Sequence, residues 1–185
     1  MLMKQWRQIL TVFLAGVLLG PAPVVHAQEA EESLVHISLD IFPKLVAVDL
    51  DLQSKLTPDN KIHLQVFYDQ NKEQGDSVAR QLREKYPRIA DYPVQVTAHS
   101  EFYSDAPTAI LLVERLKSDH LKKVTEYGVA NHILVFSPFK EDVDRGIAAG
   151  MYMAIRIHPY FNRATLNRSG IRLHQIILKS AKFYE

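Results

Sequence analysis

The sequence predicts a single-domain α/β fold, a three-layer sandwich with a mostly parallel central sheet of about five strands and a C-terminal helix packed on it. Two short segments, residues 109–113 (AILLV) and 132–136 (HILVF), are almost wholly apolar, which is typical of strands covered on both faces. Around them, segments with the period of a strand alternate with segments with the period of a helix. This order favours parallel strands joined by helical crossovers.

The first 27 residues have the features of a signal peptide. Lys4 and Arg7 precede an apolar run over residues 9–19, and Val25-His26-Ala27 supplies the small-x-small pattern after which signal peptidase cuts. The apolar run is much shorter than the roughly 20 residues that a spanning helix needs. We therefore expect cleavage after Ala27 and a periplasmic protein, while an uncleaved segment would tether the same domain on the same side of the membrane.

After the signal peptide (residues 1–27) we expect a flexible leader over residues 28–33 and one domain over residues 34–185. The domain opens with one helix that starts near Phe42, or with two short helices, because Pro43 interrupts the helical spacing. The alternation in residues 62–68 predicts the first strand.

The middle of the chain continues the alternation of helix and strand. A helix follows the first strand and is marked by apolar residues at four-residue spacing: Val78, Leu82 and Tyr86. Residues 94–98 alternate as in an edge strand. Ser118 is expected to cap a helix that runs through Tyr127 and ends at Gly128.

The C-terminal third predicts a strand and two helices. The alternation over residues 151–158 predicts one last strand, which ends at Pro159. The sequence does not decide whether this strand runs parallel or antiparallel to its neighbour. A short helix over residues 160–168 is expected to stop at Gly170. A final helix from Ile171 or Leu173 to the chain end is expected to pack on the sheet through an apolar stripe: Leu173, Ile176, Ile177, Ala181 and Tyr184.

Charge and composition exclude several classes of function. Removing residues 1–27 takes away two of the 22 basic side chains and none of the 21 acidic ones, which leaves a formal net charge of −1. This balance argues against nucleic acid as a partner, because phosphates require a clustered cationic surface. The chain has no cysteine, so disulfides, thiol catalysis and cysteine-metal sites are excluded.

No motif of nucleotide binding, hydrolysis or metal binding is present. The chain has no P-loop, G-x-G-x-x-G or G-x-S-x-G pattern, and none of the seven histidines after residue 27 is spaced four residues from another. His36 and Asp40 share one helical face and are expected to form a local pair. A triad built on Ser137 would require spatial adjacency that the sequence does not supply. We therefore predict a protein that is not an enzyme and has no metal and no cofactor.

The carboxyl ends of the predicted parallel strands are the best candidate for a ligand or partner site. In open α/β sheets ligands gather outside the carboxyl ends of the strands. The polar residues predicted at those ends are Asp69, Asn71, Glu114, Arg115, Ser137, Lys140, Asp142 and Arg145. The alternative is structural, because Asp69 and Ser137 are also good helix caps and residues 140–145 (KEDVDR) also suit a solvated helix face.

The C-terminal 40 residues resemble the end of the YfiR (YfiR/HmsC-like) family of periplasmic proteins. That family has a glycine-preceded strand, an asparagine-bearing turn, a small-residue stop and a final helix of the form leucine, leucine, x, x, alanine. The corresponding residues here are Gly146 and Gly150, Asn162, Ser169 and Gly170, and Ile177 and Leu178 with Ala181. The signal peptide and the alternating strands and helices agree with the family in outline.

The resemblance implies a small periplasmic regulator that is not an enzyme. Such proteins bind the periplasmic sensory part of an inner-membrane diguanylate cyclase of the YfiN kind, hold it inactive, and so lower cyclic-di-GMP and biofilm formation. This chain departs from family members that carry disulfides, and whether it forms a homodimer is open. The alternative from the residues is a periplasmic small-solute-binding or sensor protein that works with a transporter or a histidine kinase.

Overall fold

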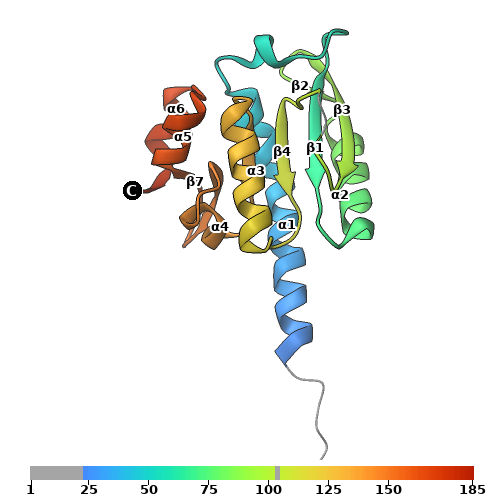
Figure 1. Cartoon of the computed structure of the whole chain (residues 1–185), viewed down its shortest axis with the longest axis vertical. Helices are drawn as coiled ribbons and strands as arrows, with labels where there is room; N and C mark the ends of the chain where they lie inside the picture. Colours follow the sequence, from blue (N-terminus) through green and yellow to red (C-terminus); the bar gives the residue numbers. More distant parts are fainter. Residues whose placement is uncertain (1–22, 103–104) are drawn as a thin grey trace, which may run out of the picture.

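A computed structural model describes residues 23–102 and 105–185, with side chains from residue 28 onward (Figure 1). At its centre lies an eight-stranded sheet of order β2-β3-β1-β4-β5-β6-β7-β8. The strands are β1 Ile62–Phe67, β2 Arg88–Ile89, β3 Tyr92–His99, β4 Ala109–Leu112, β5 Leu134–Ser137, β6 Ala149–Met153, β7 Ile157–Asn162 and β8 Lys182–Tyr184. Five neighbouring strands, β3, β1, β4, β5 and β6, run parallel.

The helices form the two outer layers. They are α1 Pro23–Ala47, α2 Lys72–Lys85, α3 Ser118–Ala130, α4 Lys140–Asp144, α5 Arg163–Ser169 and α6 Gln175–Ser180, with a 3-10 helix over Leu52–Lys55. Apolar side chains of α1 and α2 pack on one face of the sheet, and those of α3 pack on the other. The predicted α/β sandwich with a mostly parallel sheet is confirmed. The sheet has more strands than predicted for two reasons. β2 and β8 have only two and three residues and carry no readable period, and the last predicted strand is in fact two strands, β6 and β7.

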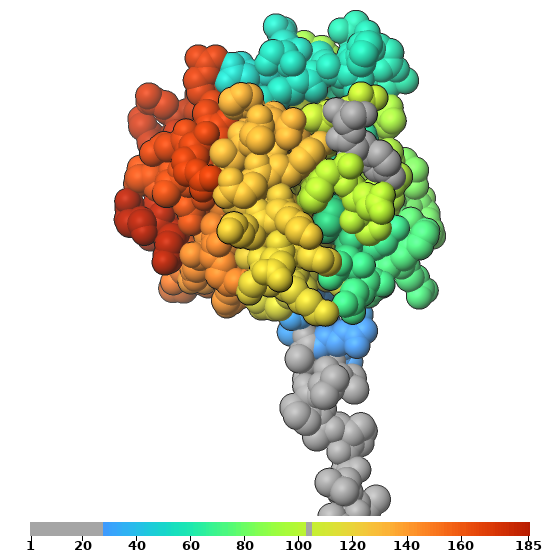
Figure 2. Space-filling view, viewed as in Figure 1, coloured from blue at the N-terminus to red at the C-terminus, as the bar shows by residue number. Residues whose placement is uncertain are grey.

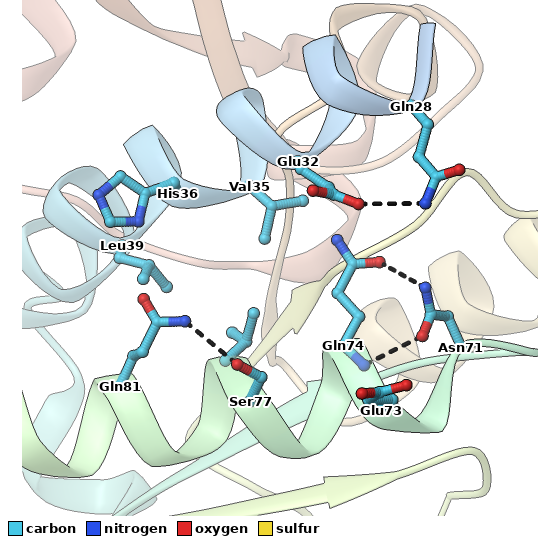
Figure 3. A pocket seen from close by; sticks show the side chains of 11 residues that line it. Gln28, Glu32, Val35, His36, Leu39, Asn71, Glu73, Gln74, Ser77 and Gln81 are labelled. Carbon is cyan, nitrogen blue, oxygen red and sulfur yellow. Dashed lines mark hydrogen bonds between the residues drawn. The ribbon is translucent and has the colours of Figure 1, made fainter. Parts of the chain in front are cut away.

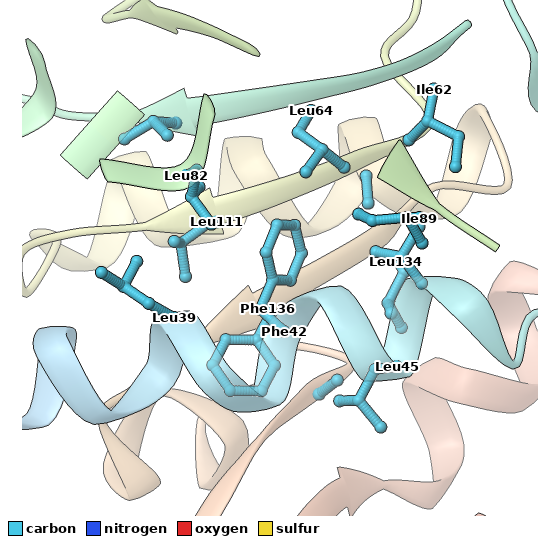
Figure 4. Packing of buried hydrophobic residues seen from close by; sticks show 14 of the residues in the cluster. Leu39, Phe42, Leu45, Ile62, Leu64, Leu82, Ile89, Leu111, Leu134 and Phe136 are labelled. Carbon is cyan, nitrogen blue, oxygen red and sulfur yellow. The ribbon is translucent and has the colours of Figure 1, made fainter. Parts of the chain in front are cut away.

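The larger core cluster lies between α1, α2 and the sheet (Figure 4). Leu39, Phe42 and Leu45 recur every third residue on α1 and are buried, and the Phe42 and Phe136 rings lie 5.8 Å apart between centroids. Alternation divides the central strands between the two faces: Leu111 points to α1, while Ile110 belongs to the cluster under α3. The two apolar segments of the sequence are therefore β4 and β5, buried on both faces as predicted.

The first helix is longer than predicted. It runs through Pro43 without a break, and residues 28–33, expected as a flexible leader, lie within it. Proline inside a helix costs about 3 kcal/mol, and here the residues on both sides of it, Phe42 and Leu45, are buried in the core. Among the described side chains the first buried apolar residue is Val35, so residues 28–185 contain the whole described core.

The predicted signal peptide is not tested. The apolar run over residues 9–19 lies outside the described residues. The expected cleavage position after Ala27 falls inside α1 and stays a prediction. In the part of the chain that the structure describes, no helix has the length and apolar character to cross a membrane.

The prediction of one last strand over residues 151–158 is wrong. Residues 149–162 form an antiparallel hairpin of two strands, β6 and β7, in which Met151 pairs with Pro159 and Met153 with Ile157. Pro159 therefore lies within a strand. The alternation of the two arms continues in phase through the short turn at residues 154–156, so the sequence pattern contains no break. Because β6 runs parallel to β5, β7 runs in the opposite direction.

The final helix is also shorter than predicted. α6 has six residues, none of them buried, and the chain then pairs as β8 with β7. Of the predicted stripe only Leu173 is buried, whereas Ile176 is 66% exposed. The helix packs against the larger core cluster only through partly buried side chains, Ile177 and Leu178, and the backbone of the last residues bonds to the sheet edge.

Two glycines predicted to end helices behave differently. Gly170 ends α5 with a φ of 64°, as predicted. Gly128 lies inside α3, which continues to Ala130, and a Cβ at this position would lie 2.5 Å from Val135 Cγ2. Gly128 therefore allows α3 to approach β5 rather than ending the helix. Ser118 is the first residue of α3, and Lys117 occupies the cap position.

Candidate functional site

The carboxyl ends of β1 and β4 form one polar cluster. Glu114, just after β4, accepts hydrogen bonds on Oε1 from the backbone N–H groups of Asp69 (2.6 Å), Gln70 (2.9 Å) and Asn71 (3.0 Å). The Asp69 carboxylate lies 2.7 Å from Nδ1 of His120 on α3. The structure thus brings Asp69, Asn71 and Glu114 together as the parallel sheet requires, and it adds His120, which no local pattern marks.

Asn71 also caps α2. Its Oδ1 accepts a hydrogen bond from the Gln74 N–H at 3.0 Å. The helix cap expected of Asp69 is thus supplied by Asn71, two residues later. These loop-end groups hold β1, β4, α2 and α3 together, and their hydrogen bonds are directed at one another.

A second cluster lies after β5. Buried Ser137 donates its hydroxyl hydrogen to Asp142 Oδ2 at 2.7 Å and accepts from the Phe139 N–H at 3.2 Å. Arg145 reaches Asp142 Oδ1 at 3.5 Å and donates to Ser118 Oγ at 3.1 Å. Burial raises the pKa of the Asp142 carboxyl, although Ser137 and Arg145 oppose the shift. Ser137 therefore supports the α4 turn and has no histidine partner in the described residues.

Asp142 gives a pH-dependent prediction. Because its pKa is higher in the folded state than its ordinary value of 3.8, the folded protein gains stability from this group as pH falls through the raised pKa and loses it as pH rises. Asp142→Asn removes the buried charge and keeps an acceptor for Ser137. We expect the variant to exceed the wild type in free energy of unfolding near neutral pH, and the difference to shrink toward pH ~4.

Asp144→Asn is the matched control with the opposite sign. Burial alone would raise the pKa of Asp144, but hydrogen bonds from Lys140 and Tyr160 outweigh it and hold the pKa below its ordinary value. This variant is expected to be less stable than the wild type at neutral pH, with a loss that fades in acid. Urea unfolding of both variants across this pH range measures the two trends. An Asp142→Asn variant that is less stable than the wild type at neutral pH would contradict a raised pKa for Asp142 in the folded protein.

Arg115 and Lys140 also pair within the domain. Arg115 contacts Glu31 of α1 at 2.7 Å and Glu141 of α4 at 2.9 Å, and its guanidinium lies 4.6 Å from the Phe139 ring centroid. Lys140 pairs with Asp144, which also accepts a hydrogen bond from Tyr160 Oη at 2.6 Å. The charged loop ends thus join neighbouring elements, and the first described turns of α1 are held at this edge of the sheet.

Two grooves border α1. The first, of about 590 Å³, lies between α1 and α2 and is lined by amide and carboxyl side chains that include Gln28, Glu32, Asn71 and Gln74 (Figure 3). Gln28 bonds to Glu32 at 3.1 Å, and Asn71 to Gln74 at 3.1 Å, so these polar groups pair across short distances within each helix.

The second groove, of about 440 Å³, is mainly apolar and lies between α1, β7 and α6. Its floor and walls consist of Ile37, Ile41, Leu45, Ile157, Pro159 and Ile177. Charged side chains at its border are Asp40 and Lys44, with His36 and His158 nearby. Asp40 bonds to Tyr86 Oη at 2.9 Å and pairs with Lys85 at 2.5 Å, so the hydrogen bonds of Asp40 reach α2 rather than the expected partner His36.

The residues of the C-terminal pattern have structural roles. Gly146 has a φ of 122°, which favours glycine, and a Cβ on Gly150 would lie 2.6 Å from the Ser137 carbonyl oxygen. Asn162 caps α5 by accepting from the Thr165 N–H at 3.0 Å and donates to the Val143 carbonyl at 2.9 Å. Leu178 and Ala181 pack, partly buried, on the larger core cluster. The pattern therefore describes how the last strands and helices are joined.

No protein-family model and no curated protein matches the chain. Among solved structures the chain is similar to "the ABC domain in complex with L-Trp" from Streptococcus pneumonia, with a TM-score of 0.50 and 12% sequence identity over 75% of this chain and 60% of that one. The chain thus spans less than two thirds of that protein's length. At this identity the likeness shows the fold alone, a single α/β domain.

Proposed function

We propose that the chain is a periplasmic regulator, not an enzyme, that binds and represses the sensory part of an inner-membrane signalling protein, a diguanylate cyclase of the YfiN kind. One observation carries the proposal. The polar loop ends are directed at one another, whereas an open groove between α1, β7 and α6 is lined mainly by apolar side chains, among them Ile37, Ile41 and Ile177. Exposed apolar side chains that cluster in this way are typical of a surface that binds a protein or a membrane.

The apolar groove between α1 and β7 is the surface that we assign to the protein partner. Ile37 and Ile41 from α1 face Ile157 and Pro159 from β7 across it. In the complex, an apolar side chain of the partner fills this groove, and Lys44 at the border of the groove contacts polar groups of the partner. Buried apolar anchors surrounded by polar contacts are the usual source of binding energy in protein interfaces.

Gene deletion tests the proposal. We expect cellular cyclic-di-GMP to rise when the gene is deleted and to return to its original level when the wild-type gene is restored. Ile37→Asp should fail to restore it, because a charge in the groove opposes apolar contact. Leu50→Asp should restore it, because Leu50 is exposed and lies outside the groove.

Two measurements complete this test. The melting temperature of purified Ile37→Asp must stay near that of the wild type, so that loss of repression reports binding. A photocrosslinker at position 37 should then capture an inner-membrane protein with a cyclase domain. Unchanged cyclic-di-GMP after deletion would refute the regulator.

A second function is favoured by one specific observation. The similar solved structure is described as a complex with L-Trp, and the groove here combines apolar walls with Lys44 at its border, a side chain that can meet the carboxylate of an apolar amino acid. At 100 times its dissociation constant, L-tryptophan would add about 2.7 kcal/mol of stability, which raises the melting temperature of a domain of this size by roughly 5–10 °C. An unchanged melting temperature, or an equal rise in Ile37→Asp, would count against solute binding in this groove.

A further inference from the structure

The end of the chain is strongly cationic although the whole is almost neutral. In residues 145–185 seven of the eight charged side chains are basic, and the one acid is the last residue, Glu185. Residues 28–144 hold 13 basic and 20 acidic side chains. Figure 2 shows that the C-terminal segment, coloured orange to red, forms one flank of the molecule. Four of the seven basic side chains form ion pairs, Arg145 with Asp142, Arg163 with Glu185, Arg168 with Glu126 and Arg172 with Asp51. The basic side chains of this segment outside these pairs are Arg156, Lys179 and Lys182.

The hairpin on this flank ends in an apolar tip. Met153 is 50% exposed, Ile157 opposite it is 43% exposed, and Ile155 in the turn between them is fully exposed. The strand pairs behind them, Met151 with Pro159 and Ala149 with Phe161, continue the same face toward the core. The tip thus extends the core face of the hairpin beyond the body of the domain.

The opposite face of the hairpin is aromatic and basic. The Tyr152 and Tyr160 rings lie 5.7 Å apart and line a hollow of about 670 Å³, together with Arg156, Lys182 and Phe183. Arg156 and Lys182 form no ion pair with any residue in the described part of the chain. The lining contains no acidic residue, and nearby Asp144 is engaged by Lys140 and the Tyr160 hydroxyl.

The hairpin tip and the start of α1 lie at the same edge of the sheet. β6 runs parallel to β5, so Met153 at its carboxyl end lies at the edge where Glu31 of α1 contacts Arg115 just after β4. Figure 1 shows α1 leaving the domain at its lower end, toward which the arrows of the parallel strands β1 and β4 point. The chain that follows the apolar residues 9–19 therefore enters the domain on the side of the hairpin tip.

We propose that the tip of the β6–β7 hairpin docks on a bilayer that contains anionic phospholipid. Ile155, Met153 and Ile157 enter the boundary between headgroups and acyl chains, and Arg156 and Lys182 meet the lipid phosphates. The tyrosine rings lie at headgroup depth, where amphipathic rings are enriched. An acidic protein segment would match the cations, but a bilayer also covers the apolar side chain at the outermost point of the turn. The proposal does not rest on the regulator, since no protein partner takes part in docking.

Tryptophan fluorescence tests the docking directly. The chain from Gln28 to Glu185 contains the whole described core and no tryptophan, because Trp6 is the only one. Ile155→Trp therefore places a single reporter at the tip, and Leu50→Trp places one at another exposed site, outside the hairpin. We expect the emission of Ile155→Trp to shift to shorter wavelength with vesicles of phosphatidylcholine and phosphatidylglycerol, and to change little with phosphatidylcholine alone. Leu50→Trp should not shift with either.

Vesicle co-sedimentation of the otherwise unaltered chain 28–185 measures the affinity. Ile155→Asp should weaken binding to the anionic vesicles roughly tenfold or more, and Arg156→Gln about fivefold. The controls Leu50→Asp and Arg80→Gln, an exposed arginine on α2, should bind as the wild type does. Added salt should weaken binding by the wild type.

The proposal is overturned if the wild type does not bind anionic vesicles at low salt, or if Ile155→Asp binds as well as Leu50→Asp. Capture of a protein by a crosslinker at position 155, without vesicle binding, would also overturn it and identify the tip as a protein contact. The vesicles contain no protein, so these experiments test lipid docking independently of the cyclic-di-GMP measurements, which test the regulator.

Discussion

Replacing Phe42 with alanine is expected to lower the free energy of unfolding by about 3–5 kcal/mol. Phe42 is completely buried on α1, and its ring packs against Phe136 of β5. The substitution removes a large apolar surface from the contact between the first helix and the middle of the sheet, and neighbours in a packed core cannot fill the space. Urea unfolding at 25 °C measures the change.

Ile155→Ala is the matched control, because Ile155 is fully exposed, and surface substitutions of this kind change stability by less than about 0.5 kcal/mol. A loss below about 1 kcal/mol for Phe42→Ala, outside the usual range for such a change, would mean that α1 does not pack on the sheet as described.

Gly150→Ala is expected to destabilise the domain by about 1–3 kcal/mol, and Gly150→Val by more. A Cβ on Gly150 would lie 2.6 Å from the Ser137 carbonyl oxygen and 2.6 Å from Val143 Cγ2. The carbonyl belongs to the pair of strands β5 and β6, in which Ser137 and Gly150 are partners, so it cannot move without breaking the ladder. Thermal and urea unfolding of the two variants measure the effect.

Ala154→Val serves as the control because it adds volume in the exposed hairpin turn. If Gly150→Ala has the same melting temperature as the wild type, α4 and β6 must lie farther apart than the structure shows.

The residues on which the YfiR resemblance depends have structural roles. Gly146, Gly150, Asn162 and Gly170 are all used to build the C-terminal strands and helices. Residues of this kind carry information about a fold, whereas partner choice depends on exposed side chains such as those of the apolar groove and hairpin tip. Variants of Ile37 and Ile155 therefore test function more directly than variants of the pattern itself.

The candidate site was only partly predictable. Parallel strands bring their carboxyl ends to one edge, so the gathering of Asp69, Asn71 and Glu114 follows from topology. Which hydrogen bonds form there does not follow, because Glu114 and His120 come from distant segments whose spacing carries no signal. The apolar groove likewise needs α1, β7 and α6 in place, and these elements lie far apart in the sequence.

Patterns within single segments predicted the elements that depend on local chemistry. Continuous apolar runs predicted β4 and β5, four-residue spacing predicted α2, and a glycine with positive φ ends α5. Long-range contacts decided the rest. α1 continues through Pro43 because the core holds both sides of it, and the last residues leave α6 to form β8 because β7 offers an unpaired edge. Periodicity is a property of one segment, whereas strand pairing and helix packing are free energies shared between segments that are far apart in the chain.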